Sequence, residues 1–238
     1  MKNVLINGGS RGIGAAMVRA FSEKGYKVAF TYNTSREDAE ALSIETGALA
    51  IKADSSSESE VANAVNIVKK NIGNVEILIN NAAVSSFSLF TDITLEEWNA
   101  MFGVNVNGAF LYSKYVLPAM INNKSGRIIN ITSMWGIVGS SCEVHYSATK
   151  AAIIGMTKAL AKELGPSGIT VNAIAPGVIR TDMNKNISES DMETLREETP
   201  LMRIGEPSDV AGAALFLAGE DASYITGEVM NVSGGFIM

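Results

Sequence analysis

The chain has 238 residues, of which 47% are hydrophobic, and this is enough to build one α/β domain with a sizeable core. Its formal net charge of −6 argues against a general electrostatic attraction to nucleic acid or to an anionic membrane. With one cysteine, Cys142, and one histidine, His145, the chain lacks both the pair needed for an internal disulfide and the usual Cys/His set of a zinc site. We therefore predict no metal, no nucleic-acid partner and no membrane partner. A Ser-His-Asp hydrolase is disfavoured too, because it would have to use His145, for which no orienting acid is identifiable.

The first residues, MKNVLINGG, contain a short apolar run, VLI, that is followed by Asn7 and two glycines. They lack the cationic start, the longer apolar stretch and the cleavage site of a signal peptide. No uninterrupted apolar run approaches the length needed to span a bilayer. These features predict a soluble, cytoplasmic protein.

Seven short apolar or β-branched runs alternate with longer helical patterns along the chain. Because long helical segments separate these runs, we expect parallel strands that are buried on both faces and joined by right-handed crossovers. No repeat, low-complexity tract or linker divides the sequence, so we predict a single domain over residues 1–238. The predicted fold class is α/β, with a Rossmann-type doubly wound parallel sheet. The predicted strands are 3–6, 27–32, 48–53, 75–80, 127–132, 169–174 and 228–232.

A glycine-rich turn, NGGSRGIG at residues 7–14, follows the first predicted strand and leads into a helical pattern. Gly8, Gly12 and Gly14 permit a tight turn and a close approach of backbone N–H groups to a pyrophosphate at the helix N-terminus. A glycine-rich turn can also be a plain turn. A strand, glycines and a helix in this order nevertheless favour a dinucleotide site.

The residues after the second predicted strand set the expected nucleotide preference. An Asp or Glu about 20 residues past the glycines would bind the ribose 2′-hydroxyl of NAD and repel the 2′-phosphate of NADP. The chain has Asn33 instead, followed by Thr34, Ser35 and Arg36, and Arg11 lies in the glycine loop. Because hydroxyl and guanidinium groups suit a phosphate, we predict NADP (NADPH). The alternative is that Thr34 or Ser35 caps the helix that begins at Arg36, and that Arg36 is solvated.

A further candidate site is the stretch SMWGIVGSSCEVHYSATK at residues 133–150, which runs from Ser133 at the end of a strand to Tyr146 and Lys150 on a helix. Four residues apart on a helix, Tyr146 and Lys150 lie on the same face. A nearby cation favours the phenolate, so we expect Lys150 to lower the pKa of Tyr146 from about 10 toward neutrality, as a general acid or base near pH 7 requires. Ser133 supplies a hydroxyl group for the phenol oxygen of Tyr146. Alone, such a Tyr/Lys pair is more often a pair of surface side chains.

Together these motifs resemble those of the short-chain dehydrogenase/reductase family, over nearly the whole chain. The glycine loop, NNAA at residues 80–83, NVNG at 105–108, the Ser/Tyr/Lys set and PGVIRTDM at 176–183 follow in the family's order. Asn7 stands where the family usually has threonine, but its amide can still hydrogen-bond nearby backbone. Ala83 replaces a glycine, which we expect to be tolerated if φ is negative there.

The resemblance implies an NADP-dependent oxidoreductase that acts on CH–OH or C=O groups, with a hydride supplied by the cofactor. It implies that Ser133 holds the carbonyl oxygen and that Tyr146 transfers the proton. Lys150 is expected to tune Tyr146 and to bind the nicotinamide ribose, and Asn105 to anchor a water relay to the lysine. The expected cofactor-binding residues are Gly8, Ser10, Arg11, Gly12, Ile13, Gly14, Asn33, Asp54, Ser55, Asn81, Tyr146, Lys150, Pro176, Gly177, Ile179 and Thr181.

Within the family, the chain is most similar to the members that reduce a 3-oxoacyl thioester on acyl carrier protein in fatty acid synthesis. A member acting on another alcohol, a sugar or a small ketone is an alternative, and a noncatalytic NADP-binding regulator is another. The resemblance also implies a homotetramer, with the helices around Asn105 and Ala151 packing against their counterparts. The polar segment 182–203, with a helix expected over 190–198, is either a substrate lid or a solvated connection. An acidic carrier protein would need basic docking residues at the site entrance, and the candidates are Lys124, Arg127, Arg180 and Arg203.

Overall fold

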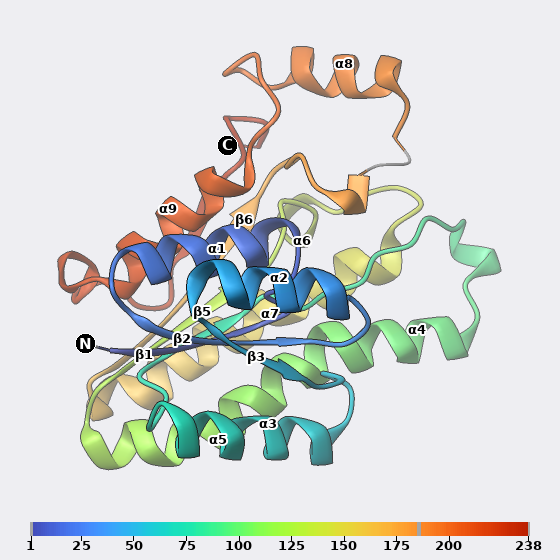
Figure 1. The fold of residues 1–238 in the computed structure, drawn as a ribbon. Coiled ribbons are helices and arrows are strands. Elements are labelled where there is room, and N and C mark those ends of the chain that lie inside the picture. Colours follow the sequence, from blue (N-terminus) through green and yellow to red (C-terminus); the bar gives the residue numbers. More distant parts are fainter. Residues whose placement is uncertain (1, 185–186, 238) are drawn as a thin grey trace.

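The computed structural model describes residues 2–184 and 187–237, which fold around a seven-stranded sheet (Figure 1). All strands pair in parallel in the order β3-β2-β1-β4-β5-β6-β7, which confirms the predicted doubly wound α/β sheet. The observed boundaries lie within two residues of the predicted ones. The strands are β1 Asn3–Asn7, β2 Lys27–Tyr32, β3 Leu49–Lys52, β4 Ile77–Asn80, β5 Gly126–Ile131, β6 Ile169–Pro176 and β7 Val229–Val232.

The sheet reverses its winding beside β1. This strand pairs with β2 on one side and with β4 on the other, so the crossovers that leave β1 and β4 run in opposite directions. In an open α/β sheet, such a switch point creates a crevice at the carboxyl ends of the strands. The loops that follow β1 and β4 therefore border the same crevice.

Helices cover both faces of the sheet (Figure 1). On one face, apolar side chains of α1, α2 and α9 pack against the strands, and on the other face those of α3, α5 and α7 do so. Because both faces are covered, the central strands are continuous apolar runs rather than alternating ones. None of the helices over the described residues is both long and apolar enough to cross a bilayer. The bounds of these helices are α1 Gly12–Glu23, α2 Arg36–Thr46, α3 Glu58–Asn71, α5 Gly108–Asn123, α7 Val144–Leu164 and α9 Pro207–Ala218.

The long helical region that the sequence predicts before residue 123 is divided into three elements. α4 (Leu95–Phe102) begins at a capping box in which Thr94 and Glu97 bond each other's backbone N–H groups. A π-helical turn (Gly103–Asn107) then leads into α5. Such turns are rare and often mark functional sites. This one contains Asn105.

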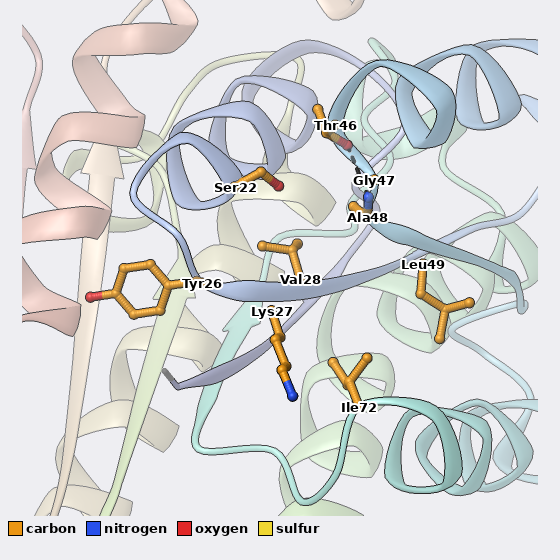
Figure 2. Close-up of a pocket in the computed structure, with 9 residues that line it drawn as sticks. All are labelled: Ser22, Tyr26, Lys27, Val28, Thr46, Gly47, Ala48, Leu49 and Ile72. Atoms are coloured by element: carbon orange, nitrogen blue, oxygen red, sulfur yellow. Dashed lines mark hydrogen bonds between the residues drawn. The ribbon is translucent and has the colours of Figure 1, made fainter.

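A pocket at the other end of the sheet is drawn in Figure 2. It lies where β2 and β3 begin, and its lining includes Lys27, Val28 and Leu49. The loop that borders it is held by a hydrogen bond of 3.2 Å from the Ala48 N–H to Thr46 Oγ1. The strands end, rather than begin, at the crevice, so this pocket is separate from the candidate site.

Candidate active site

The residues expected to carry chemistry gather where the strands end. β1 ends at Asn7, β4 at Asn80 and β6 at Pro176, while Ser133 lies two residues beyond the end of β5. Asn7 and Asn80 are register partners, and Asn80 is in turn the partner of Asn130. The strands are parallel, so these ends form one edge of the sheet. The glycine loop, the NNAA segment and the Ser133 loop thus share one border.

The glycine loop has a shape that requires glycine. Gly8 and Gly12 have φ values of +67° and +51°, a region that side chains disfavour. A Cβ atom on Gly14 would lie 2.1 Å from the Gly8 carbonyl oxygen. Arg11, the N-cap residue of α1, makes no side-chain capping bond to the first N–H groups of the helix. Backbone donors at an open helix start, beside a loop with glycine at 8, 9, 12 and 14, fit the pyrophosphate of a dinucleotide.

Asn7 joins the glycine loop to the NNAA segment. Its Oδ1 accepts hydrogen bonds from the backbone N–H groups of Asn81 and Ala82, at 2.7 and 2.6 Å. Asn81 returns a side-chain bond of 2.7 Å to the Gly8 carbonyl. The asparagine that replaces the family's threonine therefore binds backbone, as expected. Ala83 is absent from the described residues with positive φ, which confirms that alanine fits there.

Three of the expected cofactor-binding residues, Asn33, Asp54 and Ser55, lie just beyond the ends of β2 and β3. Asn33 is exposed there, and Ser55 is buried. The Ser56 hydroxyl and N–H donate to Asp54 Oδ1 at 2.7 and 2.8 Å, and these bonds lower the pKa of the Asp54 carboxyl group. The Asp54 carboxylate is therefore an ionised acceptor at neutral pH.

The two arginines expected near the 2′-phosphate both have acidic neighbours. Arg36 Nε lies 2.6 Å from Glu40 Oε1, and Arg11 Nη1 lies 4.0 Å from Asp182 Oδ2. All four side chains are at least half exposed. α2 begins at Arg36 as predicted, but Ser35 makes no side-chain capping bond. The Ser35 side chain therefore does not cap α2, although capping was the alternative to phosphate binding at this turn.

The segment after β6 borders the crevice on its other side. A Cβ atom on Gly177 would lie 2.7 Å from Ser233 Cα, so a glycine lets this turn pass close to the segment after β7. Thr181 places its Cγ2 3.2 Å from the position of a Cβ on Gly12, beside the glycine loop. Ile179 is instead buried in the apolar cluster under α9. Thr181 is thus the predicted contact residue that directly adjoins the nucleotide loop.

The expected lid follows this segment. The helix predicted over residues 190–198 is present as α8 (Glu189–Glu198), which stands away from the sheet in Figure 1. All of its residues are exposed or half-buried. Residues 185 and 186 of the expected lid lie outside the described residues.

Ser133, Tyr146 and Lys150 are all buried, and the fold brings them together. Tyr146 and Lys150 lie in the first half of α7, which packs beside the short helix α6 (Trp135–Val138) and β6. The Lys150 Nζ atom lies 5.6 Å from the centre of the Tyr146 ring. It donates a hydrogen bond of 2.9 Å to the Ile131 carbonyl oxygen at the end of β5. The ammonium is therefore held beneath the phenol ring by the sheet.

The expectation that the pKa of Tyr146 is lowered from about 10 toward neutrality is wrong in this structure. Burial raises the pKa of Tyr146 above its ordinary value, a hydrogen bond with Ser133 lowers it, and the charge of Glu143 raises it. Burial also lowers the pKa of Lys150 to about 8. Both effects have one cause, because a buried site disfavours the charged form of each group. Tyr146 is consequently protonated at neutral pH and can donate a proton.

The side-chain amide of Asn105, in the π-helical turn, makes three hydrogen bonds. Its Oδ1 accepts from the Val84 N–H at 2.8 Å, and its Nδ2 donates to the Val84 carbonyl at 2.9 Å and to Thr149 Oγ1 at 3.1 Å. The neighbouring Asn107 is exposed. The amide of Asn105 therefore holds the loop after β4 against α7, one residue before Lys150.

Two ionisable residues beside Tyr146 were not among the predicted site residues. Glu143, the N-cap residue of α7, is 6% exposed, and its Oε1 accepts from Ser85 Oγ at 2.8 Å. His145 is 1% exposed, and its Nε2 lies 2.8 Å from Ser86 Oγ. The sequence feature that could have identified them is their position, because both are ionisable residues within three positions of Tyr146.

The four candidate docking residues do not converge. Lys124 and Arg127 flank the start of β5, at the end of the sheet opposite to the crevice, so the expectation is wrong for them. Arg180 and Arg203 lie near each other, because the Arg180 N–H bonds the Gly205 carbonyl. Both have acidic partners: Arg180 binds Glu206 and Arg203 binds Asp209.

Comparison with known proteins agrees with this geometry. A family model described as Enoyl-(Acyl carrier protein) reductase matches residues 8–237. The chain is 39% identical to a 3-oxoacyl-[acyl-carrier-protein] reductase of Staphylococcus epidermidis, over 100% of this chain and 99% of that protein. It is 41% identical to a 3-oxoacyl-[acyl-carrier-protein] reductase of Synechocystis sp., over 98% and 96%. A solved mutant of a Serratia marcescens short-chain dehydrogenase/reductase superposes with a TM-score of 0.93 at 37% identity, over 99% of this chain and 97% of that one.

Replacing Gly14 by alanine tests the nucleotide loop. Because the new Cβ would collide with the Gly8 carbonyl, Gly14→Ala should weaken binding of a nicotinamide nucleotide by at least about tenfold, which corresponds to about 1.4 kcal/mol. Gly165→Ala is the matched control, since Gly165 has helical φ and ψ angles and open space around its Cβ position. Fluorescence titration with NADPH measures both. Equal affinities in the two variants would contradict the placement of the nucleotide at this loop.

Proposed function

The chain belongs to the short-chain dehydrogenase/reductase family, and from this premise we propose that it is an NADPH-dependent reductase of 3-oxoacyl thioesters carried by acyl carrier protein in fatty acid synthesis. The observation that carries the proposal is the buried group of Ser133, Tyr146 and Lys150 beside a dinucleotide loop. Relatives that are 39% and 41% identical over nearly the whole chain are 3-oxoacyl-[acyl-carrier-protein] reductases.

The catalytic roles follow from the burial of these side chains. When bound, a nicotinamide nucleotide supplies the hydride that reduces the carbonyl carbon. The Ser133 hydroxyl donates a hydrogen bond to the carbonyl oxygen and orients it. Tyr146 then gives its proton to that oxygen as negative charge develops there. The ammonium of Lys150, 5.6 Å from the ring centre, stabilises the phenolate that remains.

We place the substrate entrance under the segment 182–203, which acts as a lid. Its helix α8 packs loosely and carries many charges, as expected of an element that moves between open and closed positions. Arg180 and Arg203 remain the candidates for contact with an acidic carrier. Their acidic partners are partly exposed, so a carrier carboxylate can replace them at little cost.

The expected homotetramer is part of the proposal. Large apolar side chains are exposed on the α4–α5 region, with Leu95 74% exposed, Phe110 51% and Ile121 44%. Burial of such side chains against another copy would remove apolar surface from water. This is the region where family resemblance expects the contact between subunits.

Removal of the Tyr146 hydroxyl tests the proton donor. Tyr146→Phe should lose at least about a hundredfold in turnover while NADPH binding stays intact, because the deleted group acts in proton transfer. Tyr224→Phe is the matched control, since Tyr224 is fully exposed. Steady-state NADPH oxidation measures turnover, and fluorescence titration measures binding. Near-normal turnover in Tyr146→Phe would rule out this residue as the acid.

The nucleotide preference depends on the missing acid at the end of β2. NADPH should bind at least about tenfold more tightly than NADH, because Asn33 does not repel a 2′-phosphate and because exposed ion pairs leave Arg11 and Arg36 free to turn toward it. Asn33→Asp should shift the preference toward NADH. Asn71→Asp makes the same charge change at an exposed position on α3 and should leave it unchanged. Equal affinities for the two nucleotides in the unmodified protein would refute the prediction.

A substrate panel at two salt concentrations tests the activity itself. NADPH oxidation is followed with acetoacetyl-carrier protein, acetoacetyl-CoA, simple ketones and sugars. We expect both thioesters to be reduced, and the rate with the carrier-bound form to fall at high salt as docking charges are screened. Rapid reduction of a small ketone or a sugar, with neither thioester consumed, would reject the fatty-acid assignment while retaining the fold and mechanism.

A further inference from the structure

Glu143 is a buried acid that the proposed mechanism does not use. It lies at the N-cap of α7, three residues before Tyr146, and is 6% exposed. We propose that Glu143 is a positioning residue that sets the alkaline limit of the reductase, because it fixes a buried acidic side chain one helical turn before Tyr146. The proposal rests on the proposed function, since it requires Tyr146 to be the proton donor.

Two features concern the position of the Glu143 side chain. Ser85, in the loop after β4, donates its hydroxyl hydrogen to Glu143 Oε1 at 2.8 Å. Glu143 also lies at the N-terminus of α7, the helix end that carries partial positive charge. Glu143 makes no side-chain capping bond to α7, so its carboxylate is not required to start the helix.

A negative charge one helical turn before Tyr146 acts differently on the two protonation states of the phenol. It leaves the neutral phenol nearly unaffected and repels the phenolate, so the proton is retained. Because the site is buried, water screens this repulsion only weakly. A reductase benefits, because the acid form of Tyr146 is the form that protonates the carbonyl oxygen.

Other ionisable groups lie on the elements around Tyr146, but among the described residues none of them is a second buried acid. Lys150 lies on the same helix and bonds Ile131, while His145 contacts Ser86 in the loop after β4. On α4, Glu97 is exposed, and its carboxylate is bonded to the backbone and hydroxyl of Thr94. Among the described residues on the elements around Tyr146, Glu143 is the buried acid.

The pH profile of Glu143→Gln tests the proposal. Glutamine keeps the size of the side chain and an acceptor for Ser85 but removes the charge. We expect the descending alkaline limb of kcat/KM for 3-oxoacyl reduction, at saturating NADPH, to move about one pH unit lower. Loss of a negative charge lowers the pKa of Tyr146 and of Lys150 alike, so the limb moves in the same direction whichever of them it reports.

Glu163→Gln is the matched control, because Glu163 is an exposed acid near the other end of the same helix. Its profile should coincide with that of the unmodified protein. Glu143→Ala is a second neutral variant and should reproduce the shift if the glutamine variant does not fold. A limb that stays in place or moves to higher pH in the folded neutral variants overturns the inference. Different results would show that the proposed function itself is wrong. These are no reduction of a 3-oxoacyl thioester by the unmodified protein, or unchanged turnover in Tyr146→Phe.

Discussion

The buried ammonium of Lys150 is the constraint on which the rest of the site depends. A buried charge is costly unless polar groups satisfy it, and here the Ile131 carbonyl at the end of β5 does so at 2.9 Å. The Thr132 hydroxyl donates to the backbone carbonyl of Lys150 at 2.8 Å and fixes α7 against the same strand end. A Cβ atom on Gly136 would lie 2.7 Å from the Lys150 carbonyl carbon, so a glycine lets α6 pack directly on α7. Lys150 thus contacts the end of β5 through its side chain and its backbone, and α6 through its backbone.

A row of polar side chains connects this helix to the nucleotide loop. Asn7 donates to Asn80 at 2.8 Å, Asn80 donates to Asn130 at 2.9 Å, and Asn130 donates to Thr157 of α7 at 2.8 Å. All four residues are at most 5% exposed, so loss of one partner would leave another buried group unsatisfied at a cost of about 1–3 kcal/mol. The glycine loop and the helix that carries Tyr146 are therefore fixed to one framework.

The sequence predicts the sheet well because β-branched runs, glycines and long helical spacers are local signals. It also predicts Ser133, Tyr146 and Lys150 as a group, since strand ends and helical spacing place them together. Tertiary burial was not predictable: the pKa of Tyr146 is raised because the surrounding elements exclude water, and no spacing reports this. The π-helical turn around Asn105 and the burial of Glu143 likewise depend on contacts with the loop after β4. The prediction that Lys124 and Arg127 lie at the site entrance is wrong because it rests on their charge alone. Both residues flank the start of β5, whereas the crevice lies where the strands end.

The proposed reduction is tested most directly by following the carbonyl group from substrate to product. Acetoacetyl-carrier protein is reduced with NADPH that carries deuterium at the transferred position, and the product is examined by mass spectrometry and proton NMR. We expect a 3-hydroxybutyryl thioester that retains its oxygen and carries one deuterium at C3, because in the proposed reaction hydride goes to the carbonyl carbon while Tyr146 protonates the oxygen. An unreduced 3-oxoacyl thioester, beside a 2-enoyl thioester that the protein converts to the saturated acyl form, would contradict it.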